Sequence, residues 1–148
     1  MKVIIPVAGA GTKLSPHTYT QPKALIPLAG KTILSIIVDQ LREAGIKDFI
    51  FIIGYLGEKI QDYVKAKYPN LNCHFVQQNE RFGIGHAINL TKEIVGSDEA
   101  LIVLGDTIAE YDVKEIMSTP FSLLVVKRME ETMNYDVAEI EEDGFISR

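Results

Sequence analysis

Short apolar runs that alternate with helical segments constrain the fold of this chain more than any other feature. The first run, residues 2–8, is almost entirely apolar and rich in β-branched residues, as expected of a buried central strand. Three further runs are expected to be strands, at residues 49–53, 74–77 and 100–104. Apolar side chains recur at helical spacing over residues 33–44, with Thr32 in the N-cap position and Gly45 as a C-terminal glycine. Strands that alternate with helices predict an α/β domain with a mostly parallel sheet.

The remaining elements are expected from the same periodicities and from turn residues. Further helices are expected at residues 58–68, 83–95 and 113–117, and a fifth strand at 121–126. A hairpin is expected over residues 135–148, where an acidic turn separates two apolar segments. Because the second segment breaks off at Arg148, we expect residues 1–148 to be one domain that is truncated at its C-terminus.

Composition narrows the classes of function. The chain of 148 residues has a net charge of −5, and nucleic-acid binding usually needs a basic face, so we expect no nucleic-acid partner. No apolar stretch in the sequence reaches the length of a membrane span, so we expect no membrane partner either. The single cysteine, Cys73, cannot form an internal disulfide, which fits a reducing cytoplasm as the expected location.

A loop rich in glycine and proline follows the first strand and carries two lysines. It spans residues 9–31 and includes Lys13 and Lys23. Small residues at the end of a strand let backbone N–H groups approach an anion closely, so this loop predicts a phosphate site. Gln78 and Asp106 also follow expected strands, and parallel strands place their carboxyl ends at one edge of a sheet. We therefore expect the loop, Gln78 and Asp106 to face one crevice.

Two common phosphate-binding motifs do not match this loop. Residues 30–32 read Gly-Lys-Thr, like the end of a Walker A motif, but that motif needs glycine at the position of Leu25. A dinucleotide-binding fingerprint after the two loop glycines needs glycine or alanine at the position of Leu14. The sequence therefore disfavours both a P-loop and an NAD site.

The loop and two later segments together resemble the signature of the sugar nucleotidyltransferases, which are nucleoside-diphosphate-sugar pyrophosphorylases. The first segment reads Gly-Ala-Gly-Thr-Lys-Leu-x-Pro-x-Thr from residue 9, followed by Pro-Lys at 22–23 and Pro-Leu-Ala-Gly-Lys at 27–31. The resemblance continues at 78–87 and 104–106 and covers essentially all of the chain. It implies a three-layer α/β/α Rossmann-like nucleotidyltransferase fold with a mostly parallel central sheet.

The resemblance also implies a reaction, a cofactor and substrates. A sugar-1-phosphate, with glucose-1-phosphate the leading candidate, attacks the α-phosphate of a nucleoside triphosphate, which gives an NDP-sugar and pyrophosphate. The family uses Mg²⁺, and the form of the first motif favours UTP or dTTP as the triphosphate. The oligomeric state is left open between a monomer and a homo-oligomer.

Roles for individual residues follow from the same resemblance. Lys13 and Lys23 would be catalytic; Lys13 stands where the family usually has arginine, so it keeps the charge but lacks the planar guanidinium. Asp106 would bind the metal. Tyr135 would contact the sugar, in a segment where Asp136 replaces the family's glycine. The nucleotide would be bound by Ala8, Gly9, Gly11, Thr12, Gln78 and Gly83.

Two alternative functions share these sequence features. A non-catalytic regulatory or assembly subunit would keep the fold, and the departures at Lys13 and Asp136 favour it. A cytidylyltransferase for a phosphorylated alcohol would share the loop but would need a different acceptor pocket. The family's later Glu-Lys pair and second metal-binding aspartate do not occur within residues 1–148, so we expect negligible turnover from this chain alone.

Overall fold

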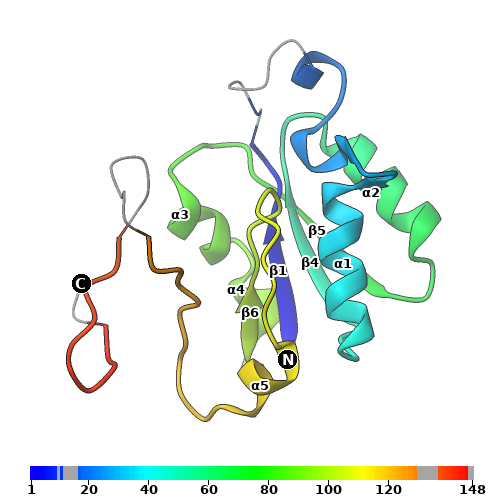
Figure 1. Ribbon diagram of the computed structural model, residues 1–148. Coiled ribbons are helices and arrows are strands. Elements are labelled where there is room, and N and C mark those ends of the chain that lie inside the picture. Colours follow the sequence, from blue (N-terminus) through cyan, green and yellow to red (C-terminus); the bar gives the residue numbers. More distant parts are fainter. Residues whose placement is uncertain (10, 12–16, 130–136, 147–148) are drawn as a thin grey trace. The chain divides into compact units, whose positions relative to one another are not determined.

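The computed structural model describes residues 1–9, 11, 17–129 and 137–146. Its central sheet has four parallel strands in the order β5-β4-β1-β6 (Figure 1). These strands are β1 (Lys2–Pro6), β4 (Asp48–Ile53), β5 (Asn72–Gln77) and β6 (Ala100–Ile102). The predicted parallel sheet is therefore confirmed, with β1 in its interior between β4 and β6.

Helices and short turns connect the strands. The α-helices are α1 (Ile33–Glu43), α2 (Gly57–Lys67), α3 (Ile84–Asn89), α4 (Lys92–Val95) and α5 (Val113–Ser118). Between β1 and α1 lie the 3-10 turns η2 (His17–Tyr19) and η3 (Lys23–Leu25) and the antiparallel pair β2 (Pro27–Leu28) and β3 (Lys31–Thr32). Figure 1 shows α1 and α2 on one side of β1, and α3 and α4 on the other.

Side chains of β1 alternate between two hydrophobic cores, as a strand covered on both faces requires. Val3 and Ile5 lie in the larger core, together with buried side chains of α1, α2 and β4. Ile4 points to the opposite face, where it packs with Ile50 of β4 and Ala87 of α3. The predicted three-layer α/β/α arrangement is therefore confirmed.

Helix α1 begins and ends at the residues that the sequence predicts. The Thr32 hydroxyl accepts a hydrogen bond from the Ser35 backbone N–H at 3.0 Å, and Ser35 Oγ accepts one from the Thr32 N–H at 3.1 Å. At the other end, Gly45 has a φ of +97° and donates its N–H to the carbonyl oxygen of Arg42. The capping box and the C-terminal glycine satisfy backbone groups that a helix cannot pair internally.

The single helix predicted over residues 83–95 is wrong. The segment forms two short helices, α3 and α4, and Thr91 lies at the break between them. Its Oγ1 donates to the carbonyl oxygen of Ile88 at 2.7 Å. A hydroxyl that binds a preceding carbonyl competes with regular helical hydrogen bonding, which gives a local reason for the interruption.

The strand predicted over residues 121–126 is also wrong. These residues are all described and form no strand, and the side chain of Phe121 is 68% exposed. A strand needs a neighbouring strand for its backbone N–H and C=O groups, so apolar and β-branched residues are not sufficient by themselves.

The chain divides into two compact units, Met1–Val113 and Lys114–Arg148. Within the second unit, the described part of the predicted hairpin consists of a single antiparallel bridge between Ile140 and Ile146, around a turn that contains Gly144. Residues 135, 136, 147 and 148 of that prediction lie outside the described residues. One domain over residues 1–148 stays a prediction. None of the described helices is long and apolar enough to cross a membrane.

Candidate active site

A cavity of about 520 Å³ lies at the carboxyl edge of the sheet, beside the ends of β1 and β6. The chain leaves β1 for β4 and β5 on one side and returns to β6 on the other, so the order of strands reverses at β1. Ligands of parallel α/β sheets bind at such a switch point, outside the carboxyl ends of the strands. The cavity is lined by Pro6, Val7, Gly9, Gly11, Lys23, Ala24, Ile84, Leu104, Gly105 and Asp106.

Gly105 lets the segment after β6 pack directly on the end of β1. A Cβ atom at this position would lie 2.2 Å from Val7 Cγ1 and 2.8 Å from the carbonyl oxygen of Pro6. Both distances are shorter than van der Waals contact, so a larger residue would push the two segments apart. The close approach brings Asp106 to the cavity that the loop after β1 also lines.

Gly11 allows a similarly close approach within the loop. Its φ is +62°, and a Cβ atom there would lie 2.9 Å from Thr18 Cγ2 and 3.1 Å from Lys23 Cβ. The Thr18 hydroxyl, which belongs to a buried side chain, donates to the carbonyl oxygen of Gly11 at 3.0 Å. The loop at Gly11 therefore packs directly against Thr18 and Lys23.

Lys23 and Asp106 meet at the cavity. Lys23 Nζ lies 2.6 Å from Asp106 Oδ2, and their side chains are 33% and 47% exposed. Thr107 Oγ1 donates to the other carboxylate oxygen at 3.2 Å. Burial raises the pKa of Asp106, but the hydrogen bond and charge of Lys23, with the Thr107 hydrogen bond, outweigh burial and lower the pKa below its usual range. Asp106 is therefore an ionised carboxylate at neutral pH.

The chemistry of this carboxylate suits a divalent metal that is held mainly by a substrate. Mg²⁺ is typically bound by one or two carboxylates together with substrate phosphates and water. Within the described part of the chain, no group of three or more His, Cys, Asp or Glu side chains is arranged to hold a metal alone. Asp106 could therefore contribute a ligand beside a bound triphosphate, whereas a closed protein site is absent from the described residues.

Several predicted site residues lie elsewhere among the described residues. Gln78 is half-buried and continues the pairing of β4 with β5, because its N–H donates to the Ile53 carbonyl oxygen at 2.8 Å. Gly83 has a φ of +90° and precedes α3. Ala8 lies against Gly54, where an added Cβ atom would be 2.9 Å from the Ala8 Cβ. None of these three is among the described residues that line the cavity.

The cavity also contains residues that the sequence analysis missed, and four predicted positions lie outside the described residues. The missed residues of the lining are apolar residues and one glycine: Pro6, Val7, Ala24, Ile84, Leu104 and Gly105. Ile84 directly follows Gly83 in the motif at 78–87, and Gly105 directly precedes Asp106. Their positions next to predicted site residues in the sequence could therefore have indicated that they line the cavity. The positions outside the described residues are Thr12, Lys13, Tyr135 and Asp136.

Comparisons with known proteins agree with this arrangement. The sequence profile described as nucleotidyl transferase matches residues 2–146. A UTP–glucose-1-phosphate uridylyltransferase from Staphylococcus epidermidis is 32% identical over 141 residues, which cover 78% of this chain and 49% of that enzyme. The structure of HddC from Yersinia pseudotuberculosis complexed with GMP-PN is 28% identical, with a TM-score of 0.69 over 78% of this chain and 52% of that chain. A UDP-glucose pyrophosphorylase complexed with UDP-glucose is 26% identical, with a TM-score of 0.63 over 71% of this chain and 45% of that chain.

The chain spans about half the length of these relatives. Enzymes of this kind generally use a divalent metal ion, which fits the ionised Asp106 at the cavity. The profile match extends over nearly the whole sequence, and the solved relatives named above are similar to it in structure. On these grounds, the chain belongs to the nucleotidyl transferase family.

Proposed function

We propose that this chain is the nucleotide-binding part of a sugar-1-phosphate nucleotidyltransferase. In the proposed reaction, a phosphate oxygen of the sugar-1-phosphate attacks the α-phosphorus of a nucleoside triphosphate. The new P–O bond forms as the bond from the α-phosphorus to the oxygen bridging to the β-phosphate breaks, and pyrophosphate leaves. The relatives named above support this reaction, because one is a UTP–glucose-1-phosphate uridylyltransferase and another holds UDP-glucose.

The observation that carries the proposal is the pairing of Lys23 with Asp106 at the switch-point cavity. Phosphoryl-type transfer depends mainly on positioning and on charge stabilisation, which a lysine and a metal ion supply. We assign Lys23 to the phosphates and Asp106 to Mg²⁺, which would neutralise phosphate charge when bound. Lys13 would be the second catalytic cation.

The backbone of the loop would complete the phosphate site. A Cβ atom at Gly9 would meet no described atom within 4 Å, so its backbone can be approached by a ligand, and Gly9 and Gly11 both line the cavity. Ala8 and Thr12 are assigned to the same nucleotide contact. Small residues at a strand end permit this approach because no side chain separates the ligand from the backbone N–H groups.

Base and sugar recognition are assigned to other residues. We assign Gln78 and Gly83 to the base, with UTP or dTTP as the nucleotide, and Tyr135 to the sugar, with glucose-1-phosphate as the acceptor. Ile84 supports the base assignment, because it follows Gly83 in sequence and lines the cavity. One solved relative holds a uridine nucleotide and another a guanosine nucleotide, so the base is the feature to test first.

Nucleotide binding by the chain itself tests the proposal. Heat-denaturation midpoints are measured with Mg²⁺ and each of UTP, dTTP, ATP and GTP, because a ligand that binds the folded state raises the midpoint. We expect the largest shift with UTP or dTTP, and no shift with the variant Lys23→Met. Absence of a shift with all four nucleotides would refute the proposed function, and a clear preference for a purine would refute the pyrimidine assignment.

A further inference from the structure

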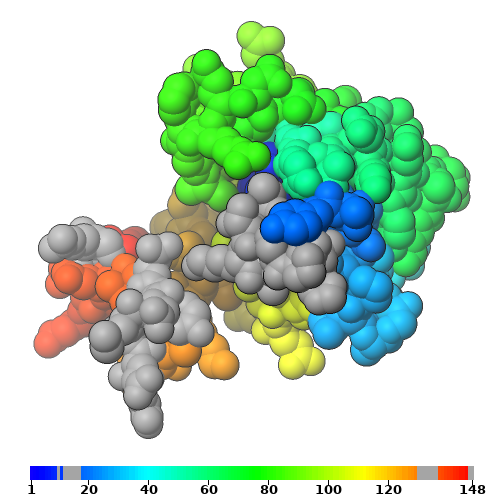
Figure 2. Space-filling model, turned by 90° about the horizontal axis from the view of Figure 1, so that it is seen from above, coloured from blue at the N-terminus to red at the C-terminus, as the bar shows by residue number. Residues whose placement is uncertain are grey.

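Helix α2 and the turn before it hold the loop that carries Lys23. Tyr55 donates its phenolic hydrogen to the carbonyl oxygen of Tyr19 at 2.9 Å, and Lys59 Nζ donates to the carbonyl oxygen of Thr20 at 2.6 Å. Seen from above in Figure 2, the blue segment near residue 20 lies against the green residues at the start of α2. One side chain from the β4–α2 connection and one from the first turn of α2 thus bind successive carbonyl groups just before Lys23.

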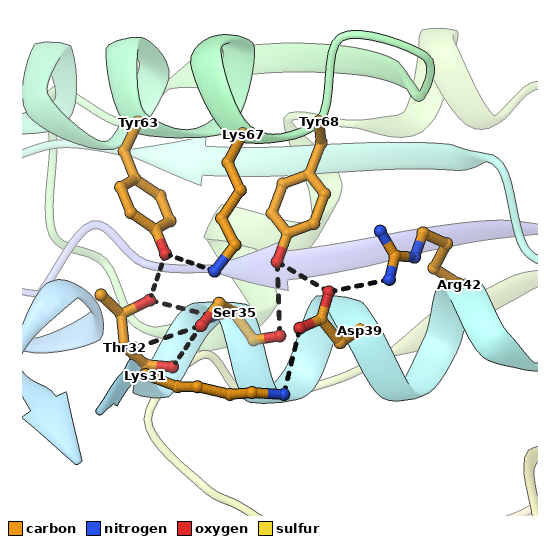
Figure 3. Close-up of polar contacts among 8 residues, drawn as sticks. All are labelled: Lys31, Thr32, Ser35, Asp39, Arg42, Tyr63, Lys67 and Tyr68. Carbon is orange, nitrogen blue, oxygen red and sulfur yellow. Dashed lines mark hydrogen bonds and ion pairs between the residues drawn. The ribbon is translucent and has the colours of Figure 1, made fainter. Parts of the chain in front are cut away.

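The same face of α2 contacts the far end of this loop. Tyr63 Oη accepts hydrogen bonds from Thr32 Oγ1 at 2.9 Å and from Lys67 Nζ at 3.1 Å (Figure 3). Burial raises the pKa of Tyr63, but hydrogen bonds from Thr32, Ser35 and Lys67 and the charge of Lys67 outweigh it, so the pKa is lowered. Lys59, Tyr63 and Lys67 follow one another at intervals of four, which places them along one side of the helix.

The segment between these contacts is held partly by the core and partly by these hydrogen bonds. The side chains of Thr18 and Ala24 are buried, but that of Tyr19 is 66% exposed. In the η3 turn, the Leu25 N–H donates to the Pro22 carbonyl oxygen and the Ile26 N–H donates to the Lys23 carbonyl oxygen. The side chains of Ala24 and Leu25 anchor this turn in the larger core. The bonds from Tyr55 and Lys59 to the carbonyl groups of residues 19 and 20 therefore hold the exposed backbone just before η3.

We propose that Lys59 and Tyr55 are positioning residues for Lys23. They hold the backbone immediately before η3, so that the Lys23 ammonium stays at the cavity, beside Asp106 and the triphosphate that we assign there. Lys59 is outside the described cavity lining, and its ammonium is bound to a carbonyl oxygen, so its effect passes through the loop. This inference rests on the proposed role of Lys23 as a phosphate ligand.

Four variants of the 148-residue chain test the inference. Lys59→Met removes the donor to Thr20, Lys59→Arg keeps a cationic donor, and Tyr55→Phe removes the donor to Tyr19. Lys65→Met is the matched control: Lys65 is on the same helix, but its ammonium lies over the Phe75 ring, 5.7 Å from the ring centre.

Hydrogen exchange of the Leu25 and Ile26 amides is the first measurement, because both amides donate within the η3 turn. Exchange of such amides reports local opening separately from global unfolding. We expect Lys59→Met and Tyr55→Phe each to lower their protection about fivefold, the effect of one hydrogen bond, with the amides of β4 unchanged. Lys59→Arg should restore protection, and Lys65→Met should leave it as in the original chain.

Affinity for UTP with Mg²⁺, measured by calorimetry, is the second measurement. Lys59→Met should weaken binding about fivefold, and Lys59→Arg should restore it. Unchanged exchange in Lys59→Met would overturn the inference, and so would weaker binding without faster exchange, since Lys59 would then bind the nucleotide directly. If the original chain binds no triphosphate, the proposed function fails, whereas the exchange data still decide whether α2 holds the loop.

Discussion

Lys23 and Asp106 are 83 residues apart in the sequence, yet the ammonium of one lies 2.6 Å from the carboxylate of the other. In the ligand-free chain, the cation assigned to phosphate and the anion assigned to metal neutralise each other. A metal–triphosphate complex would exchange this ion pair for two separate ones, between Lys23 and phosphate and between Asp106 and the metal. The free energy of the existing pair therefore opposes binding only slightly, because partly exposed ion pairs contribute about 1 kcal/mol or less.

Lys23→Met should abolish nucleotide binding but lower the stability of the fold only slightly. Loss of a partly exposed ion pair should lower the free energy of unfolding by less than about 1 kcal/mol. Loss of the ammonium group that we assign to the phosphates should abolish the UTP-dependent rise in the denaturation midpoint. Urea unfolding and calorimetric titration measure the two effects, and Lys31→Met serves as the control because Lys31 pairs with Asp39 instead. Undiminished UTP affinity in Lys23→Met would contradict the role given to Lys23.

The pKa of Asp106 should respond to the same substitution. Folding lowers this pKa, so the carboxylate stabilises the protein above its unfolded pKa of about 3.9, and the contribution is lost as pH falls through the lowered folded value. In Lys23→Met, the ammonium that lowers the Asp106 pKa is missing, whereas burial still raises it. We therefore expect the Asp106 pKa to rise. Carboxyl carbon NMR titration measures it directly. An Asp106 pKa equal in the original chain and in Lys23→Met would show that the ion pair does not form in solution.

Gly105→Ala should destabilise the first unit. The new methyl group would lie 2.2 Å from Val7 Cγ1 and 2.8 Å from the Pro6 carbonyl oxygen, so β1 and the segment after β6 must separate. Overpacking of this kind lowers the free energy of unfolding by about 1–3 kcal/mol. Gly85→Ala is the matched control, because its methyl group would meet no described atom within 4 Å and alanine favours a helix. Equal stability of the two variants in urea would contradict the close packing at Gly105.

Thr32→Ala should weaken the start of α1 and its contact with α2. The substitution removes the oxygen that accepts from the Ser35 N–H and the hydroxyl that donates to Tyr63. Loss of an N-cap lowers the free energy of unfolding by about 1 kcal/mol, within a range of about 0.5–2 kcal/mol. Tyr63→Phe is the comparison, because it removes the contact with α2 but leaves the cap, and it should have the smaller effect. A larger loss in Tyr63→Phe than in Thr32→Ala would contradict the importance of the cap.

The sequence was most informative where neighbouring residues decide the structure. Thr32 and Gly45 identify the ends of α1, because capping depends on residues within one helical turn. It was least informative where a segment needs a distant partner. Residues 121–126 have strand-like composition but form no strand, and Thr91 interrupts a helix whose apolar pattern continues.

The candidate site shows the same division. Placement of the glycine loop and Asp106 at one edge of the sheet was predictable, because parallel strands align their carboxyl ends. The apolar lining from Ile84 and Leu104, and the position of Gln78 outside that lining, were not predictable from their motifs. A motif places a residue in the chain, but the lining of a cavity depends on how separate segments pack.

By itself, the sequence determined the alternation of strands and helices, the capping of α1 and the order of the nucleotidyltransferase motifs. These properties depend on periodicity and on residues close together in the chain. Tertiary structure alone decided that Lys23 meets Asp106, that Gly105 packs on Val7, and that Lys59 binds the carbonyl of Thr20. Such contacts arise only when the strand order brings loops from distant parts of the chain to the same edge of the sheet.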